Sequence, residues 1–392
     1  MTKKILWIVV NTCRLLVSAT FIFSGLVKLL DPAGTSYKIV DYAAALGTNF
    51  LAQPPLPMTL AVAMALLEFT LGIYLFFGIR RRFTTYTILA FMLVYTPLTL
   101  WLAMTNAVAD CGCFGDAIHL TNWQTFWKNV ALLAAAIILF WRGNLLTRVI
   151  SESTQWIISL YSLAYALFIA FLCIWAEPII DFRPFHIGQN IPKAMEWPED
   201  PSLQPEILDF DVDPTLIEDT GYVFILTSPH LETADDSNFE DINAIYDYSQ
   251  QYGYRFVCLT PAEDATITRW QDLTGAQYPF DFADELTLKT IARNNPAITL
   301  LHNGTVVGKW GHRQLPKAEA LNAPLHQLSL AHPHEASYRH MLLRLLLWYI
   351  VPLLTITFLD RAYASFRWWR RRKDKKEEGI IKNEESGLQN EK

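Results

Sequence analysis

Two cysteines separated by one glycine are the clearest sign of chemistry in this chain of 392 residues. Cys111 and Cys113 lie in the segment Asp-Cys-Gly-Cys-Phe-Gly-Asp, residues 110–116. Cysteines two positions apart can bring their Cα atoms within the ~4.4 to 6.8 Å that a disulfide needs, and Gly112 gives the freedom for so tight a turn. Such a ring is strained, and strain favours an exchangeable disulfide. The spacing therefore predicts a thiol–disulfide oxidoreductase with Cys111 and Cys113 as its catalytic pair, in roles that the sequence does not separate.

Two other interpretations of the pair stay open. The segment can be a structural turn whose cysteines pack or pair elsewhere. It can also bind a metal together with Asp116 and His119, although the ligands are few for a metal site. The other cysteines, Cys13, Cys173 and Cys258, fall in apolar segments, which is typical of small buried side chains.

Six apolar segments must position this loop. The chain is 52% hydrophobic, more than the roughly 45 to 50% of soluble globular proteins, and a membrane-spanning helix needs ~20 mostly apolar residues. The first segment lacks a small-residue cleavage site and is too long for a signal peptide, so we expect an uncleaved anchor. The six segments are Ile5–Leu30, Met58–Ile79, Thr84–Asn106, Trp123–Trp141, Gln155–Ala176 and Met341–Leu359.

Basic residues alternate with these segments and predict the orientation. Lysine and arginine groups lie at residues 3–4, 80–82, 142–148 and 367–376, whereas the loops between them are acidic or neutral. Short basic loops stay in the cytoplasm. We therefore expect six crossings of a bacterial inner membrane with both termini cytoplasmic. The Cys111 loop and residues 178–338 would then be periplasmic, in an oxidising compartment.

Three ionisable side chains fall inside or beside the predicted spans. Arg14 lies near the middle of the first span and Glu68 near the middle of the second. Intramembrane charges usually pair or serve function, so we expect an Arg14–Glu68 ion pair. Lys28 lies near the end of the first span, where its amine can reach the membrane surface.

The first half of the chain resembles a known family. The segment Phe-Ser-Gly-Leu-Val-Lys-Leu at residues 23–29, Glu68 with Gly72, and the Cys-Gly-Cys-Phe-Gly loop are similar to the DoxX and MauE group of four-helix membrane proteins. The resemblance covers roughly Ile5 to Arg142. It implies a bundle linked to extracytoplasmic thiol chemistry and, for MauE-like members, to maturation of methylamine dehydrogenase in methylamine metabolism.

The sequence between the fifth and sixth predicted spans is typical of an α/β domain. The pattern predicts strands at 222–228, 255–260, 297–302 and 305–310, and helices at 238–252, 266–273, 285–293 and 316–328. Asn303-Gly304 predicts a type I′ hairpin. This order resembles the thioredoxin fold, with Pro296 as the candidate cis-proline. No thiol stands in residues 227–231, where that family carries its cysteines, so we expect a redox-silent domain.

These elements give a membrane helical bundle plus an extracytoplasmic thioredoxin-like domain. The expected divisions are a bundle at 1–145, a fifth helix at 150–177, the α/β domain at 178–338, a sixth helix at 341–360, and a basic, then disordered tail at 361–392.

The leading hypothesis is disulfide exchange with a protein client that docks on the α/β domain. A quinone as electron acceptor follows from analogy alone. The alternative is a non-enzymatic scaffold or assembly factor, and a transporter ranks third. The histidines at 230, 332, 334 and 340 are interpreted as surface or linker residues, and no nucleic-acid partner is expected.

Overall fold

A computed structural model describes residues 3–108, 110–199, 204–208, 210, 212–332 and 335–390. Within these residues, six helices are long and apolar enough to cross a membrane, which confirms the number of spans predicted from the sequence. The protein is therefore a multi-pass membrane protein in contact with the lipid bilayer. The six helices are α1 (Lys3–Leu30), α3 (Leu56–Phe77), α4 (Arg81–Thr105), α5 (Asn122–Arg142), α6 (Gln155–Trp175) and α12 (Glu335–Asn390).

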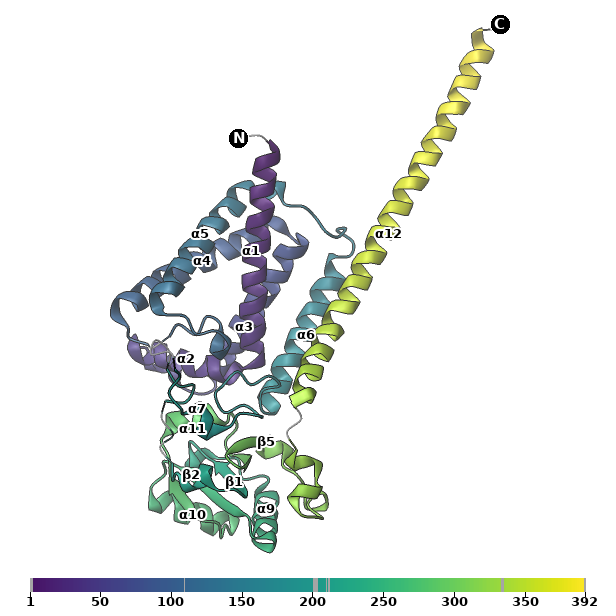
Figure 1. The fold of residues 1–392 in the computed structure, drawn as a ribbon. Helices are drawn as coiled ribbons and strands as arrows, with labels where there is room; N and C mark the ends of the chain where they lie inside the picture. The colour runs from purple at the N-terminus through teal and green to yellow at the C-terminus, as the bar shows by residue number, and fades with distance from the viewer. Residues whose placement is uncertain are drawn as a thin grey trace.

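The bundle has two distinct ends. The chain between α6 and α12 forms a mixed α/β region, which we call the sheet domain. It packs against one end of the bundle, which we call the sheet end (Figure 1). The start of α1 and the last part of α12 both lie at the other end, the terminal end (Figure 1). The loop that carries Cys111 follows α4 and lies at the sheet end, beside the sheet domain.

A further helix, α2 (Pro32–Ala45), covers the sheet end and was not predicted from the sequence. Asp31 is its N-cap and accepts a hydrogen bond from the backbone of Gly34 at 2.9 Å, while Pro32 occupies the first turn. Both residues are typical of a helix start. The helix is short and carries several polar residues, so it lacks the long apolar run of a spanning helix.

Helices α1 and α3 pack unusually closely. A Cβ atom on Gly25 would lie 2.4 Å from the backbone nitrogen of Phe69, and one on Gly72 would lie 2.7 Å from that of Ile22. No side chain fits in these gaps, so glycine at both positions lets the two backbones touch. This contact fixes the register between the two helices.

The sheet domain contains five strands in the order β3-β2-β1-β4-β5. Strand β1 pairs in parallel with β2, and β2 with β3, whereas β4 is antiparallel to both β1 and β5. This confirms the predicted parallel pair and closing hairpin; the edge strand β3 was not predicted. The strands are β1 (Tyr222–Thr227), β2 (Arg255–Thr260), β3 (Phe280–Phe282), β4 (Ala297–His302) and β5 (Thr305–Gly311).

Both faces of the sheet are buried. Val223 and Ile225 of β1 pack in one core with α11 (Glu285–Ile291), on the side toward the bundle (Figure 1). Phe224 and Leu226 pack in the other core, with α9 (Phe239–Tyr252) and α10 (Asp264–Thr274). A strand covered on both faces is apolar at every position, which explains the continuous hydrophobic run in the sequence.

The hairpin is confirmed in detail, but the last predicted helix is wrong. Asn303 and Gly304 have φ values of 51° and 68°, the positive values that a type I′ turn requires. Residues 316–328 form only short 3-10 turns, at Ala318–Ala320 and Leu325–Gln327, because Pro324 lacks the N–H that a continuous helix would need. The remaining short elements are α7 (Ile191–Ala194), α8 (Thr215–Glu218) and 3-10 turns at Asn49–Ala52, Gly115–Ala117, Gly143–Leu145, Leu231–Thr233, His312–Gln314 and Ser329–Ala331.

Candidate thiol site at the sheet end of the bundle

Cys111 and Cys113 face each other across a tight turn. The backbone N–H of Cys113 donates to the sulfur of Cys111 at 3.2 Å, and the N–H of Gly112 donates to the carboxylate of Asp110 at 2.6 Å. Gly112 has a φ of +62°, in the left-handed region that favours glycine. Both cysteines are free thiols in this structure. The turn therefore holds two reduced sulfurs close together.

The two thiols are chemically unequal. Cys113 is 8% exposed, whereas Cys111 is partly exposed. The hydrogen bond from the Cys113 thiol is the main cause that lowers the pKa of Cys111 to about 6, against the opposing effect of burial. The sulfur of Cys111 also lies 3.6 Å from the hydroxyl of Thr125, which lowers its pKa further. The same hydrogen bond and burial raise the pKa of Cys113. Cys111 is thus suited to be the nucleophile, and Cys113 to remain protonated until it is needed.

A buried ion pair between α1 and α3 lies next to the thiol turn and supports it. The amine of Lys28 lies 2.7 Å from both carboxylate oxygens of Glu68, with exposed fractions of 2% and 3%. The hydroxyl of Ser24 lies 2.6 Å from Glu68 and 2.7 Å from the carbonyl oxygen of Cys113, and it accepts from Lys28 at 3.0 Å. Helices α1 and α3 are thereby connected directly to the backbone of the thiol turn.

The predicted Arg14–Glu68 ion pair is wrong. Arg14 donates to the backbone carbonyl of Thr147 at 2.7 Å, at the terminal end of the bundle. The contact of Gly25 with Phe69 sets the level of Glu68, and the eleven residues from Arg14 to Gly25 span about 16 Å of helix. The midpoint of an apolar segment is therefore a poor measure of depth in α1. The partner of Glu68 is Lys28, whose amine is buried in this pair and so is not free to extend outward as the sequence suggested.

A cavity of about 230 Å³ opens beside the thiols, between α2, α3 and α4. Its walls are mainly apolar, and its polar lining includes Lys28 and the tyrosines at positions 42 and 95. The hydroxyl of Tyr42 donates to the carbonyl oxygen of Cys111 at 3.3 Å. Cys111, Gly112 and Cys113 form one wall, so a small ligand in this cavity would contact the pair directly.

The sheet domain contacts the thiol loop through one arginine. The guanidinium of Arg293 donates to Asp31 at 2.6 Å and to Asp116 at 2.7 Å. It is 8% exposed, and it lies 5.4 Å from the ring centre of Tyr37 in α2. Arg293 therefore ties the sheet domain to both α2 and the loop of Cys111. No sequence pattern indicated this contact, because the three charged residues lie far apart along the chain.

The residues that follow α6 hold this arginine in place. Glu177 accepts hydrogen bonds from the backbone N–H groups of Arg293 and Asn294 at 3.0 Å and 2.9 Å. Glu177 in turn pairs with Arg183 at 3.1 Å, and Arg183 pairs with Asp181 at 2.6 Å. Charge-assisted bonds of this kind are short and directional. They fix the loop that leads into β4 against the end of α6.

That loop continues to Pro296, whose peptide bond with Asn295 is cis, the isomer that the sequence left open. The side chain of Asn295 accepts from the hydroxyl of Ser228 at 2.7 Å and donates to the carbonyl oxygen of His230 at 2.7 Å. Polar side chains thus connect this loop to the end of β1. Cys258, within β2, is fully buried, and burial raises the pKa of its thiol. It is not poised for exchange.

The metal interpretation of the loop receives no support from its geometry. Asp116 accepts from Arg293, and His119 is exposed. Among the described residues, no group of three potential ligands lies close enough to hold an ion. His334 lies outside the described residues.

Comparison with known proteins supports the resemblance of the first half. Residues 3–142 match the family model described as Methylamine utilisation protein MauE. No curated protein and no solved structure matches the chain. The matched region contains α1 to α5, the buried Lys28–Glu68 pair and both cysteines of the turn. The similarity to the MauE family therefore covers the membrane helices of residues 3–142 and not the rest of the chain.

Proposed function

We propose that this membrane protein exchanges disulfides with a protein client through Cys111 and Cys113. The observation that carries the proposal is the asymmetry of the pair. The sulfur of Cys111 is partly exposed, has a pKa of about 6 and accepts the backbone N–H of Cys113 at 3.2 Å, whereas the thiol of Cys113 is buried and its pKa is raised. A low-pKa thiolate next to a resolving thiol is the arrangement that disulfide exchange requires.

The exchange proceeds in two balanced steps. The Cys111 thiolate attacks one sulfur of a client disulfide, a mixed disulfide forms, and the other client sulfur leaves as a thiolate and takes a proton. Cys113 then loses its proton and attacks the sulfur of Cys111. The second client thiolate is released, and the Cys111–Cys113 disulfide forms. In this direction two electrons pass from the pair to the client. With an electron acceptor the sequence runs in reverse: a client thiolate attacks the Cys111 sulfur of the Cys111–Cys113 disulfide, Cys113 leaves and takes a proton, the second client thiolate displaces Cys111, and the reduced pair passes two electrons to the acceptor.

The sheet domain is proposed as a thioredoxin-like docking domain without redox activity of its own. Its strand order, with a parallel β1–β2 pair and an antiparallel β4–β5 hairpin, supports this comparison. Residues 227–231, where a thioredoxin would carry its cysteines, contain no thiol, and Ser228 in this segment donates to the side chain of Asn295 beside Pro296. A domain tied to the thiol loop by Arg293 would present a client close to Cys111.

The proposed orientation has both termini in the cytoplasm of a bacterial inner membrane. Arginines gather at the terminal end of the bundle, at residues 80–82, 142 and 148, which is the pattern of a cytoplasmic face. The thiol turn and the sheet domain would then face the oxidising periplasm. The family description makes a client in methylamine utilisation our first candidate.

The electron acceptor is proposed to bind in the cavity beside the pair. Its apolar walls and its two tyrosines suit the ring of a membrane quinone, which is the acceptor that analogy suggests. Leu98 lines the cavity, and Leu98→Trp would fill part of it. That variant should slow reoxidation of the reduced pair by a water-soluble quinone analogue and leave oxidation of a client dithiol by the Cys111–Cys113 disulfide unchanged in a single turnover.

Trapping the mixed disulfide tests the main proposal. In membranes from Cys113→Ser cells, Cys111 should remain bound to the client, and the adduct should disappear on reduction. Cys111→Ser is the matched control, because its remaining thiol is buried and protonated. An adduct of equal yield in both variants, or in neither, would contradict the assignment of Cys111 as nucleophile and Cys113 as resolving thiol.

The alternative is a scaffold or assembly factor whose cysteine turn is structural. The observation in its favour is that the turn is itself part of a packed interface, since Ser24 holds the Cys113 carbonyl and Arg293 holds Asp116. A strain with both cysteines changed to serine separates the two functions. Full activity in that strain favours the scaffold, and loss of activity with normal protein levels favours exchange.

A further inference from the structure

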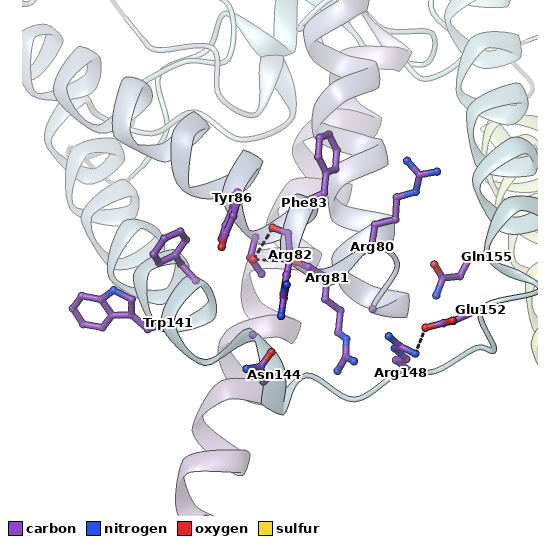
Figure 2. A pocket seen from close by; sticks show the side chains of 14 residues that line it. Arg80, Arg81, Arg82, Phe83, Tyr86, Trp141, Asn144, Arg148, Glu152 and Gln155 are labelled. Atoms are coloured by element: carbon purple, nitrogen blue, oxygen red, sulfur yellow. Dashed lines mark hydrogen bonds and ion pairs between the residues drawn. The ribbon is translucent and has the colours of Figure 1, made fainter.

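The terminal end of the bundle contains a second cavity, far from the thiols. It has a volume of about 890 Å³ and lies between the start of α4, the end of α5 and the start of α6. Figure 2 shows arginines at the start of α4 and in the loop before α6 that line it. They are Arg80, Arg81, Arg82 and Arg148.

The cavity carries excess positive charge. Four arginines and a single carboxylate, Glu152, line it, which leaves a formal charge of +3. Arg148 pairs with Glu152, and Arg81 donates to the backbone carbonyl of Leu146 at 2.7 Å. Among the described residues, no hydrogen bond or ion pair engages the guanidinium of Arg80 or Arg82. Arg80 and Arg82 therefore line the cavity with a charge that no carboxylate among the described residues compensates.

The backbone at the start of α4 adds to the positive charge of the cavity. Helix α4 begins at Arg81, its N-cap Arg80 makes no side-chain cap, and its first turn contains no acidic residue. The first N–H groups of a helix are unsatisfied, and the helix dipole places partial positive charge there. Side chains and backbone thus favour the same kind of ligand, an anion with several acceptor oxygens.

Aromatic side chains extend the cavity toward the lipid. Phe83, Tyr86 and Trp141 line it, with exposed fractions of 60%, 53% and 74%. Trp141 and Tyr86 lie together on one side of the arginines (Figure 2). Exposed aromatic rings at a helix end are typical of the membrane interface, where they contact the glycerol and upper acyl region of lipids.

We propose that this cavity, lined by Arg80, Arg82, Arg148 and Trp141, binds the phosphate of an anionic phospholipid at the terminal face of the membrane. The arginines would hold the headgroup, and the aromatic residues would contact the lipid tail. A free phosphate compound could satisfy the arginines but would leave the aromatic side without a partner. The site is independent of the thiol pair.

Native mass spectrometry of the full chain tests the proposal. Protein released from nanodiscs of mixed phosphatidylglycerol and phosphatidylcholine should retain phosphatidylglycerol in preference. Each basic residue near a membrane surface contributes about a fivefold factor in affinity for anionic lipid. Arg80→Gln with Arg82→Gln should therefore weaken retention about 25-fold. Arg80→Lys with Arg82→Lys, which keeps the charge, should weaken it much less and shows that the fold tolerates substitution there.

The matched control removes the same charge elsewhere. Arg370→Gln with Arg371→Gln neutralises two exposed arginines of α12. General attraction to an anionic surface would weaken retention as much in this control, whereas a specific site predicts that the control retains clearly more phosphatidylglycerol than Arg80→Gln with Arg82→Gln. Equal loss in both double variants would mean general surface attraction and would overturn the site. Displacement of the lipid by millimolar inorganic phosphate, with no preference for phosphatidylglycerol, would identify a site for free phosphate instead.

Discussion

The pH at which Cys111 becomes nucleophilic follows directly from the geometry of the turn. Its pKa of about 6 rests mainly on the hydrogen bond from Cys113. A thiolate is present above the pKa and lost below it, so at pH 7 about nine-tenths of Cys111 would be thiolate. An ordinary thiol with a pKa of ~8.5 would be only about 3% ionised at that pH.

Replacing the donor should reverse this shift. Cys113→Ala removes the thiol that contributes most to the lowering, but it keeps the backbone N–H of residue 113, Thr125 and Lys128, so the pKa of Cys111 should rise toward the ordinary value of ~8.5. Cys113→Ser keeps a hydroxyl that can donate and should give a smaller rise. Thr125→Val removes a lesser contribution and should move the pKa less than Cys113→Ala does.

The assay is the rate of alkylation of reduced Cys111 by a small neutral reagent between pH 4 and 10, followed by peptide mass spectrometry. Because a thiolate of lower pKa is intrinsically less nucleophilic, the midpoint of the profile is the diagnostic quantity and not the plateau rate. A midpoint near 8.5 in the unaltered chain would rule out the proposed thiolate. A midpoint that Cys113→Ala leaves unchanged would rule out the hydrogen bond from Cys113 as its cause.

Two further predictions concern the supports of the turn. Lys28→Met or Glu68→Gln should lower the free energy of unfolding by ~3 to 5 kcal/mol, since each leaves a buried charge unpaired. In denaturant titrations the unfolding free energies of Lys28→Met and Glu68→Gln should be strongly non-additive. Those of Arg14→Gln and Glu68→Gln should add within ~0.5 kcal/mol. Coupling between Arg14 and Glu68 would contradict the register that Gly25 sets between α1 and α3. Arg293→Gln should speed hydrogen exchange of residues 110–116, because their anchor to the sheet domain is lost. Arg255→Gln, which breaks an exposed pair with Asp213, should leave that exchange unchanged.

The spans and strands could be predicted because each is determined by a local pattern. About 20 apolar residues define a membrane helix, and a fully buried strand is a short, continuously apolar run. Helix α2 and strand β3 escaped prediction because one has mixed polarity and the other has only three residues. The helix predicted at 316–328 is wrong because Pro324 has no N–H to continue a helix, and two short 3-10 turns form instead.

The site was only partly predictable for a related reason. The Cys-Gly-Cys spacing identified the pair, but its asymmetry depends on which sulfur is buried, a tertiary property. The partner of Glu68 depends on the register that Gly25 sets between α1 and α3, and no apolar pattern encodes that register. Ser24 and Lys28 lie four residues apart on one helix face, so this spacing was an available signal for their contact.

The redox state of Cys111 and Cys113 in intact membranes is the decisive observable for disulfide exchange. Membranes equilibrated with thiol buffers of graded potential would be treated with an alkylating reagent before and after reduction, and the peptide of residues 110–116 would be analysed by mass spectrometry. We expect a reversible two-electron transition between two free thiols and one Cys111–Cys113 disulfide. Two thiols that stay free at every potential, or a disulfide that never reduces, would show that the pair does not exchange.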